Sequence, residues 1–360
     1  MNIYKNVQLI MYGEDKNPPL SMILKGTSFL YGAIVSLRGL FYKKGLFRTK
    51  HLPKPVISIG NLTVGGTGKT PAVIMVGEML LKMGKKPAIL SRGYKREGKN
   101  VSTIVSDGNS LLLDRRCAGD EPYMIAKRLK GVPVIVGSNR FDSGLLALKN
   151  FDVDLFILDD AFQRIQLHRD LNILLIDSKN PFGNGYLFPR GILREPVEAA
   201  TRADLIILTK CDSDSVSIPQ LPQDVPTALA AAPISKLVDI KSGETTPIES
   251  IGGKKIAAFC GIGSPESFSE SLSNLGAEVV VFKPFPDHHS YSSNDINAIL
   301  LEATEEGAEY IVTTEKDSVK LSKNISATVP FLFVSIDMKF LKGEEILKQA
   351  IQNLFSPDSK

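Results

Sequence analysis

The stretch that decides the fold runs from Val56 to Pro71 and reads VISIGNLTVGGTGKTP. It opens with a β-branched apolar run typical of a buried strand, and a glycine-rich turn and a helical stretch follow. A turn in this position directs several backbone N–H groups toward phosphate oxygens, and the helix N-terminus adds a field that favours anions. The stretch therefore predicts a phosphate-binding loop in an α/β protein of the P-loop NTPase type.

The residues expected to bind nucleotide are Gly65, Gly66, Thr67, Gly68, Lys69 and Thr70. Lys69 is predicted to reach the β- and γ-phosphates, and the Thr70 hydroxyl to bind Mg²⁺. One departure is visible, because the first glycine of GxxxxGK would fall at position 63, where this chain has Thr63. The loop is closer to the variant KGGxGKT, with Val64 in place of the variant's lysine.

Outward from this loop, short apolar runs alternate with amphipathic stretches, which predicts a doubly wound parallel sheet. The expected strands are Val56–Ile59, Ala88–Leu90, Val134–Val136, Leu155–Leu158, Asn172–Ile176 and Leu205–Leu208. The expected helices are Pro71–Met83, Glu121–Lys130 and Phe141–Lys149. We assign residues 51–215 to this P-loop kinase domain.

Composition changes after residue 211, where serine, proline and threonine become frequent and no long apolar run occurs. This predicts a linker or crossing segment at 216–250. A second, smaller α/β domain is expected at 251–360. Its strands are predicted at Lys255–Cys260, Glu278–Phe282, Tyr310–Thr313 and Phe331–Val334, and its helices near Ser264–Leu275, Ile296–Glu306 and Glu344–Leu354. A ligand site is expected in the cleft between the two domains.

The N-terminal segment, residues 1–50, carries an uncharged apolar run from Gly26 to Leu37, bounded by Lys25 and Arg38. At 12 residues it is shorter than the ~20 that a spanning helix needs. Apolar residues with a basic and aromatic border indicate an amphipathic helix lying in the membrane interface. The alternative is an amphipathic helix packed on its own domain.

Composition narrows the class of protein. The 360 residues are 43% hydrophobic and 23% charged, as in globular proteins, and the net charge of +4 is too small to indicate a nucleic-acid partner. The three cysteines, Cys117, Cys211 and Cys260, are far apart, which argues against a disulfide framework and a cysteine-rich zinc site. Nothing in the sequence implies an obligate protein partner.

Acidic residues at strand and helix ends are the candidate metal ligands and base. Asp159 and Asp160 follow an apolar strand, where a P-loop enzyme holds its Mg²⁺, and Asp159 is the first choice. Asp120 and Glu121 open a predicted helix, where a carboxylate is most often an N-cap. A kinase acting on a hydroxyl also needs a base. His288, in a loop of the second domain, is placed to reach such an aspartate across the cleft.

Two arginine-bearing loops are candidate ligand contacts. Arg92 and Tyr94 follow the strand Ala88–Leu90, where loops face the ligand in open α/β sheets. Arg190 and Arg194 lie in FPRGILRE, and arginines of this kind bind phosphate or stabilise transferring charge. A solvated, structural arginine is the alternative in each loop.

Together these segments resemble the tetraacyldisaccharide 4′-kinase family, the lipid A 4′-kinases. The resemblance rests on GNLTVGGTGKTP, SRGY, GDEP, DDAFQ, NGYLFPRGILREP, FPDHHSY and TTEKD, in this order between about residues 30 and 320. It implies ATP- and Mg²⁺-dependent phosphorylation of the 4′-hydroxyl of a tetraacylated glucosamine disaccharide 1-phosphate, a glycolipid. It also implies peripheral attachment to the cytoplasmic face of the bacterial inner membrane.

Residue by residue, the resemblance implies that Asp120 is the catalytic base and that His288 assists it. Asp159, with Asp160 and Glu121 nearby, corresponds to the acidic metal region. The remaining matches, to residues around nucleotide or substrate, are Arg92, Tyr94, Gln163 and Arg194. Ala161 and Arg164 stand where family members often carry glycine and histidine, so no role is placed on them.

Three other functions remain open on the sequence alone. Thr209-Lys210-Cys211-Asp212 is similar to the base-reading NKxD of GTPases, so a nucleotide-driven switch is one, although threonine in place of asparagine favours ATP. A cytosolic small-molecule kinase is another, in which the apolar N-terminus would be core. A non-enzymatic interaction module is the third, and it leaves the acidic and histidine motifs unexplained.

Overall fold

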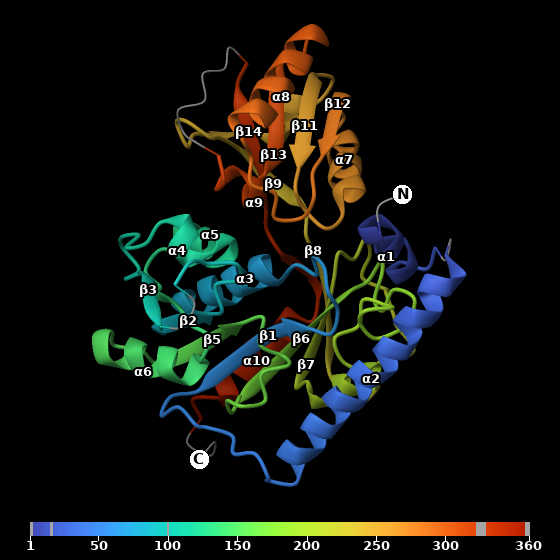
Figure 1. The fold of residues 1–360 in the computed structure, drawn as a ribbon. Helices are drawn as coiled ribbons and strands as arrows, with labels where there is room; N and C mark the ends of the chain where they lie inside the picture. The colour runs from blue at the N-terminus through green and yellow to red at the C-terminus, as the bar shows by residue number, and fades with distance from the viewer. Residues whose placement is uncertain (1–2, 15–16, 99–100, 322–328, 357–360) are drawn as a thin grey trace.

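The computed structural model describes residues 3–14, 17–98, 101–321 and 329–356. The chain forms two lobes, each built around its own β-sheet (Figure 1). The large lobe contains a nine-stranded sheet and the small lobe a six-stranded one. The mixed α/β class expected from the sequence is confirmed. The outermost residues of the predicted segments, 1–2 and 357–360, lie outside the described residues.

The large sheet has the strand order β15-β8-β7-β6-β1-β5-β2-β4-β3. Its inner neighbours all pair in parallel, and β15 and β3 pair antiparallel at the two edges. The strands are β1 (Val56–Asn61), β2 (Pro87–Ser91), β3 (Thr103–Ser106), β4 (Val134–Val136), β5 (Leu155–Asp159), β6 (Leu171–Asp177), β7 (Leu205–Thr209), β8 (Thr227–Ala231) and β15 (Lys339–Lys342). The six predicted strands are confirmed as β1, β2, β4, β5, β6 and β7.

Helices cover both faces of this sheet, as a doubly wound fold requires. On one face Ile57 and Ile59 of β1 pack in a core with residues of α3 (Lys69–Lys82), α5 (Asp120–Arg128) and α10 (Glu344–Asn353). On the other face Val56 packs in a core with α6 (Arg140–Asn150). The short α4 (Arg115–Ala118) precedes α5, and the 3₁₀ helix η1 spans Val197–Arg202.

The small lobe has the strand order β10-β9-β14-β13-β11-β12. Its strands are β9 (Ile234–Asp239), β10 (Thr245–Thr246), β11 (Lys255–Cys260), β12 (Glu278–Pro284), β13 (Tyr310–Thr314) and β14 (Phe331–Ile336). Its helices are α7 (Pro265–Asn274), α8 (Ser293–Glu305), α9 (Glu315–Ser318) and the 3₁₀ helix η2 (Ile248–Ile251). The four strands predicted for this region are all present.

The junction between the lobes differs from the prediction. Residues 216–250 were expected to be a linker, but β8 lies in the large sheet and β9 and β10 lie in the small one. The end of the chain was expected in the small lobe, but β15 pairs with β8, and α10 (red in Figure 1) packs on the large sheet. The polypeptide therefore crosses between the lobes twice. Short strands such as TALAA carry little local signal, and β8 pairs with β15 although the two strands lie more than 100 residues apart in the sequence.

The N-terminal residues form two helices, α1 (Ile3–Met11) and α2 (Pro18–Lys43), and the predicted apolar run lies inside α2. Asn17 caps α2 by accepting a hydrogen bond from the Leu20 backbone N–H, and Pro18 suits the first turn because proline has no N–H to satisfy. Helix α2, blue in Figure 1, runs along the outside of the large lobe.

Helix α2 buries small and polar residues and exposes apolar ones, the opposite of a helix that packs on the core of a soluble protein. Its buried residues are Ser21, Ser28 and Gly32. Its exposed residues include Met22, Ile23, Phe29, Leu30, Ile34 and Leu37, and the Phe29 side chain is 81% exposed. Among the described helices, α2 alone is long and apolar enough to cross a bilayer, by length and composition. A large apolar surface with no cover marks a protein or membrane contact.

Candidate functional site

The phosphate-binding loop connects β1 to α3, as the sequence predicted. Gly65 and Gly68 adopt left-handed backbone angles, with φ of +114° and +80°, which other residues rarely adopt. The Thr209 hydroxyl donates a hydrogen bond of 3.0 Å to the Thr67 carbonyl and so ties the end of β7 to the loop. Thr209 occupies the asparagine position of the NKxD-like segment, and its hydroxyl is engaged in holding the phosphate loop.

Lys69 begins α3 and points back under the loop. Its Nζ donates to Asn61 Oδ1 at 3.3 Å and lies 3.8 Å from Asp160 Oδ1. Burial lowers the pKa of the Lys69 ammonium, and the Asp160 carboxylate opposes that shift. An ammonium at a helix N-terminus directly after a glycine-rich loop is placed to receive a phosphate.

Asp159 and Asp160, at the end of β5, have opposite environments. Asp159 is buried and accepts a hydrogen bond of 2.7 Å from the Ser91 hydroxyl. Burial, with the charge of Asp160 beside it, raises the pKa of Asp159 to about 6. Burial would also raise the pKa of Asp160, but Lys69 and Arg194, whose Nη1 lies 2.9 Å from Oδ1, hold it below its ordinary value.

The carboxylates predicted to bind Mg²⁺ differ in how their charge is already compensated. Asp160 is already paired with two cations, whereas Asp159 has one neutral partner and excess negative charge. Glu121 faces the small lobe, 3.5 Å from Lys316 Nζ. No cluster of three or more histidine, cysteine or acidic side chains that could hold a metal occurs in the described residues. Mg²⁺ commonly binds one or two carboxylates plus phosphate and water, so Thr70 and Asp159 fit it best.

Asp120 and His288, which the sequence analysis assigned to different domains, are in contact. Asp120 Oδ2 lies 3.3 Å from His288 Nδ1, and Asp120 Oδ1 accepts from Arg115 Nη1 at 2.9 Å. Burial would raise the pKa of Asp120, but the hydrogen bonds from His288 and Arg115 and the charge of Lys320 lower it to about 2. The carboxylate is therefore ionised across the physiological pH range. His288 has φ of +64°, a strained conformation for a non-glycine residue.

The other predicted ligand contacts lie around these two groups. The Tyr94 ring is 5.4 Å from the His288 ring, centroid to centroid, and is half exposed. Gln163 donates 2.7 Å to the carbonyl of Asn61, just before the phosphate loop. Arg92 is exposed on the loop after β2. These contacts place Tyr94 beside His288 at the contact between the lobes and Gln163 at the end of β1 beside the phosphate loop, whereas Arg190 lies over the Tyr186 ring.

Sequence reasoning missed four cations of this site. Arg115 binds Asp120, Lys316 lies near Glu121, and Lys320 lies 3.9 Å from Asp120 Oδ2. Arg140 is buried near the Asp159 and Asp160 charges, and its Nε and Nη2 find no partner among the described residues. Lys316 belongs to the TTEKD segment, which served only as a family marker. No local pattern separates these lysines and arginines from solvated ones.

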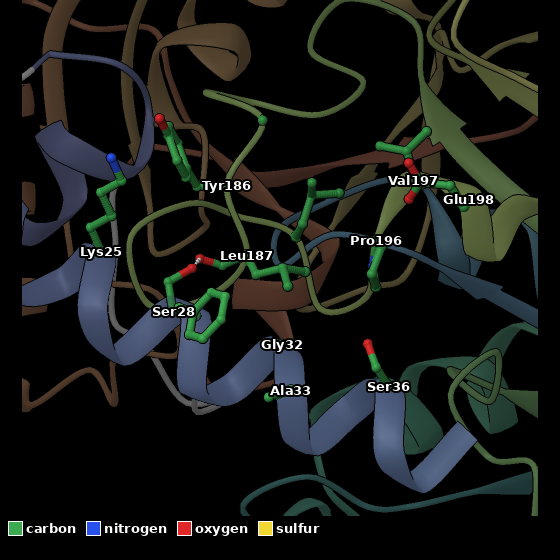
Figure 2. Close-up of a pocket in the computed structure, with 13 residues that line it drawn as sticks. Lys25, Ser28, Gly32, Ala33, Ser36, Tyr186, Leu187, Pro196, Val197 and Glu198 are labelled. Carbon is green, nitrogen blue, oxygen red and sulfur yellow. Dashed lines mark hydrogen bonds between the residues drawn. The ribbon is translucent and has the colours of Figure 1, made fainter. Parts of the chain in front are cut away.

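A cavity of about 590 Å³ lies away from the phosphate loop, between α2 and the segment 185–198 (Figure 2). Lys25, Ser28 and Gly32 of α2 face Tyr186, Leu187 and Pro196 across it. The Ser28 hydroxyl donates to the Leu187 carbonyl at 2.7 Å, and Tyr31 donates to the Arg194 carbonyl at 2.9 Å. The cavity therefore adjoins the segment that carries Arg194 into the phosphate site.

Known proteins match this chain along most of its length. The model of the tetraacyldisaccharide-1-P 4′-kinase family matches residues 20–356. The tetraacyldisaccharide 4′-kinase of Syntrophus aciditrophicus is 43% identical over 345 residues, covering 91% of this chain and 92% of that protein. The tetraacyldisaccharide 4′-kinase of Geobacter sulfurreducens is 41% identical over 320 residues, covering 89% of this chain and 90% of that protein.

A solved structure agrees with these relatives. LpxK from Aquifex aeolicus, crystallised in complex with ATP, matches with a TM-score of 0.79 and 38% sequence identity. The match covers 94% of this chain and 100% of that one. Sequence and structure therefore agree over both lobes, and the chain belongs to the tetraacyldisaccharide-1-P 4′-kinase family.

Proposed function

We propose that this protein transfers the γ-phosphoryl group of ATP to the 4′-hydroxyl of a tetraacylated disaccharide 1-phosphate, a step of lipid A synthesis. The observation that carries the proposal is the arrangement of two groups. Lys69 lies at the start of α3, directly after the phosphate loop, and a histidine-bound carboxylate lies at the contact between the lobes. The family relationship supports the choice of substrate, and the geometry supports the roles proposed for the residues.

The phosphate loop and Lys69 would bind the β- and γ-phosphates of ATP. Thr70 and Asp159 would hold Mg²⁺, which neutralises charge on the transferring phosphoryl group when it is bound. Arg194 reaches the same pocket through its ion pair with Asp160 and is placed to contact the γ-phosphate or the sugar. A buried cationic pocket favours the trigonal transition state because the charge that develops on its oxygens meets fixed positive groups.

Asp120 would act as the base for the sugar hydroxyl. The 4′-oxygen forms a bond to the γ-phosphorus while the bond from that phosphorus to the β,γ-bridging oxygen breaks, and ADP leaves. The hydroxyl proton passes to the Asp120 carboxylate, which becomes neutral, and His288 Nδ1, 3.3 Å from Oδ2, would hold that carboxylate in place. Because Asp120 belongs to the large lobe and His288 to the small one, the two lobes together form this part of the site.

We further propose that α2 lies in the interface of the bacterial inner membrane, on its cytoplasmic face, where ATP is available. Support comes from the exposed apolar side of α2 and from the hydrogen bonds that hold its polar side to the large lobe. The adjacent cavity is lined by Phe29 and Leu187 and is wide enough for part of an acyl chain. A lipid could then enter from the membrane toward Arg194.

The decisive experiment is transfer from γ-labelled ATP to the disaccharide 1-phosphate in mixed micelles, with the labelled lipid separated by thin-layer chromatography. We expect one labelled lipid product that depends on Mg²⁺ and on the 4′-hydroxyl, and none from an acceptor with that hydroxyl removed. Labelled inorganic phosphate released from GTP without lipid, and no labelled lipid, would instead identify a nucleotide-driven switch.

A further inference from the structure

Lys320, just after α9 of the small lobe, is a buried cation that the proposed chemistry does not use. Its side chain is 1% exposed, and its Nζ lies 2.9 Å from Asp317 Oδ1 and 3.9 Å from Asp120 Oδ2. A buried ammonium is costly unless its charge is compensated. Its position between two carboxylates, one from each lobe, therefore requires an explanation.

Asp317 of the small lobe fixes the position of the Lys320 ammonium. The Asp317 side chain is fully buried, and its Oδ2 accepts from the Gly261 N–H at 2.9 Å and from the Thr314 hydroxyl at 2.7 Å. This carboxylate thus fixes the start of α9 and the loop after β11 through Oδ2, and its Oδ1 holds Lys320. Asp317 sets the direction of Lys320, and that direction is toward Asp120.

The charges around Asp120 divide between the lobes. Arg115, from α4 of the large lobe, binds Oδ1, while His288 and Lys320 from the small lobe face Oδ2. Lys316 faces the neighbouring Glu121, 3.5 Å away, and is 3.2 Å from His288 Nε2. Asp120 Oδ2 therefore faces an imidazole and an ammonium, both from the small lobe.

We propose that Lys320 is a positioning residue that orients the Asp120 carboxylate toward the sugar hydroxyl by a charge contact made from the opposite lobe. With Arg115 drawing one oxygen and Lys320 the other, the carboxylate plane is held between two fixed cations. At 3.9 Å the Lys320 contact is electrostatic rather than a hydrogen bond, so it leaves a lone pair of Oδ2 available to a hydroxyl. This inference rests on the proposed function, because it assigns Asp120 as the base.

The test compares neutral replacements of the pair. Lys320→Met with Asp317→Asn removes the cation without leaving a buried charge alone. We expect kcat about 10–100-fold lower and KM for ATP within about twofold, while Lys320→Arg should retain kcat within about fivefold. Lys283→Met with Glu302→Gln, which removes a small-lobe ion pair on β12 and α8, is the matched control and should leave kcat unchanged.

A double-mutant cycle separates positioning from a structural effect. In an Asp120→Asn background the Lys320 and Asp317 replacements should lower the residual kcat by less than about twofold, because their target is gone. An equal loss in both backgrounds, or a folded double variant with unchanged kcat, would overturn the inference. If the variant with Lys320→Met and Asp317→Asn does not fold, Lys320→Gln, which keeps a hydrogen bond to Asp317, is expected to lower kcat in the same way.

Failure of the proposed function gives a different result. Absence of lipid phosphorylation by the unchanged protein would refute that function and this inference with it. An active unchanged protein with an equally active Lys320 variant would refute only the role of Lys320.

Discussion

At the scale of single residues, the site separates carboxylates by their surroundings. Asp120, held by cations from both lobes, has a pKa lowered to about 2, whereas the buried Asp159 has a pKa raised to about 6. Asp120 stays ionised beside a histidine, so it can orient a hydroxyl and accept its proton, and the buried Asp159 offers the carboxylate oxygens that a divalent cation prefers. The two roles follow from environment because the side chains are chemically identical.

The assignment of Asp120 predicts the effect of replacing it by asparagine. Asp120→Asn should lower kcat by about 10²–10⁴-fold and leave KM for ATP within about twofold, because the phosphate loop is untouched. Steady-state kinetics with the lipid acceptor would measure this. Asp152→Asn, at an exposed aspartate paired with Lys86, is the control and should not change kcat. A loss smaller than about tenfold at Asp120 would remove it as the base.

Lys69 is expected to bind phosphate directly. The Lys69→Met variant should lose most of the rise in melting temperature that Mg²⁺ and ATP produce, because binding stabilises the folded state in proportion to affinity. Thermal unfolding with and without the nucleotide measures it. The Asp160–Arg194 pair remains in this variant, so the protein should fold. A full nucleotide-dependent shift in Lys69→Met would contradict its place in the site.

At the scale of elements, the phosphate loop depends on backbone shape. A Cβ on Gly68 would lie 3.2 Å from Met338 Cε, at a left-handed φ, while a Cβ on Gly66 would meet nothing within 4 Å. Without nucleotide, Gly68→Ala should therefore lower the free energy of unfolding by about 1 kcal/mol and Gly66→Ala by less. Urea denaturation compares the two variants, and an equal effect at both positions would show that the loop is not strained at Gly68.

Helix α2 is the other element whose role depends on one face. Two changes on that face, Phe29→Glu and Ile34→Glu, should leave the free energy of unfolding within about 0.5 kcal/mol because both side chains are exposed. Binding to anionic phospholipid vesicles, measured by co-sedimentation, should weaken at least about tenfold. Leu112→Glu with Leu145→Glu adds the same charge at exposed large-lobe positions. If these controls weaken binding equally, net charge rather than the α2 face accounts for the effect.

At the scale of the whole molecule, Arg128 at the end of α5 fastens the lobes together. Its guanidinium contacts Glu315 of α9 at 3.3 Å, the Ile336 carbonyl at 2.9 Å and the Asp337 carboxylate in the segment between β14 and β15. Since α5 begins at Asp120, the same helix carries the proposed base at one end and Arg128 at the other. The fastening thereby helps keep Asp120 against His288.

Removing this contact has a pH-dependent cost. Arg128→Met should lower the free energy of unfolding at pH 7 by about 2–4 kcal/mol, because Glu315 is left buried without its cation. Burial already raises the pKa of Glu315, so its folded form takes up a proton more readily than its unfolded form. The deficit relative to the unchanged protein should therefore shrink as pH falls from 7 to 5. Urea denaturation at pH 7 and at pH 5 measures this deficit. The double variant Arg128→Met/Glu315→Gln is expected to recover stability.

Much of the large lobe could be predicted because its signals are local. The strands β1, β5 and β6 are continuous apolar runs. Lys69 and Thr70 follow β1 and its glycine-rich turn at the spacing of a phosphate-binding loop. β8, β15 and the return of α10 could not be predicted in the same way. Their sequences are short or weakly apolar. The pairing of β8 with β15 joins residues more than 100 positions apart, so no local pattern indicates it.

By itself, the amino-acid sequence determined the phosphate loop, the acidic residues after β5 and an apolar N-terminal helix, because each is set by neighbours within one element. Only the tertiary structure decided that Asp120 meets His288 and Lys320, that α2 presents its apolar side outward, and that the chain crosses the lobes twice. The physical reason is the sequence distance over which each interaction acts. Backbone shape and periodicity act over a few residues, whereas a buried charge finds its partner wherever folding brings one within a few ångströms.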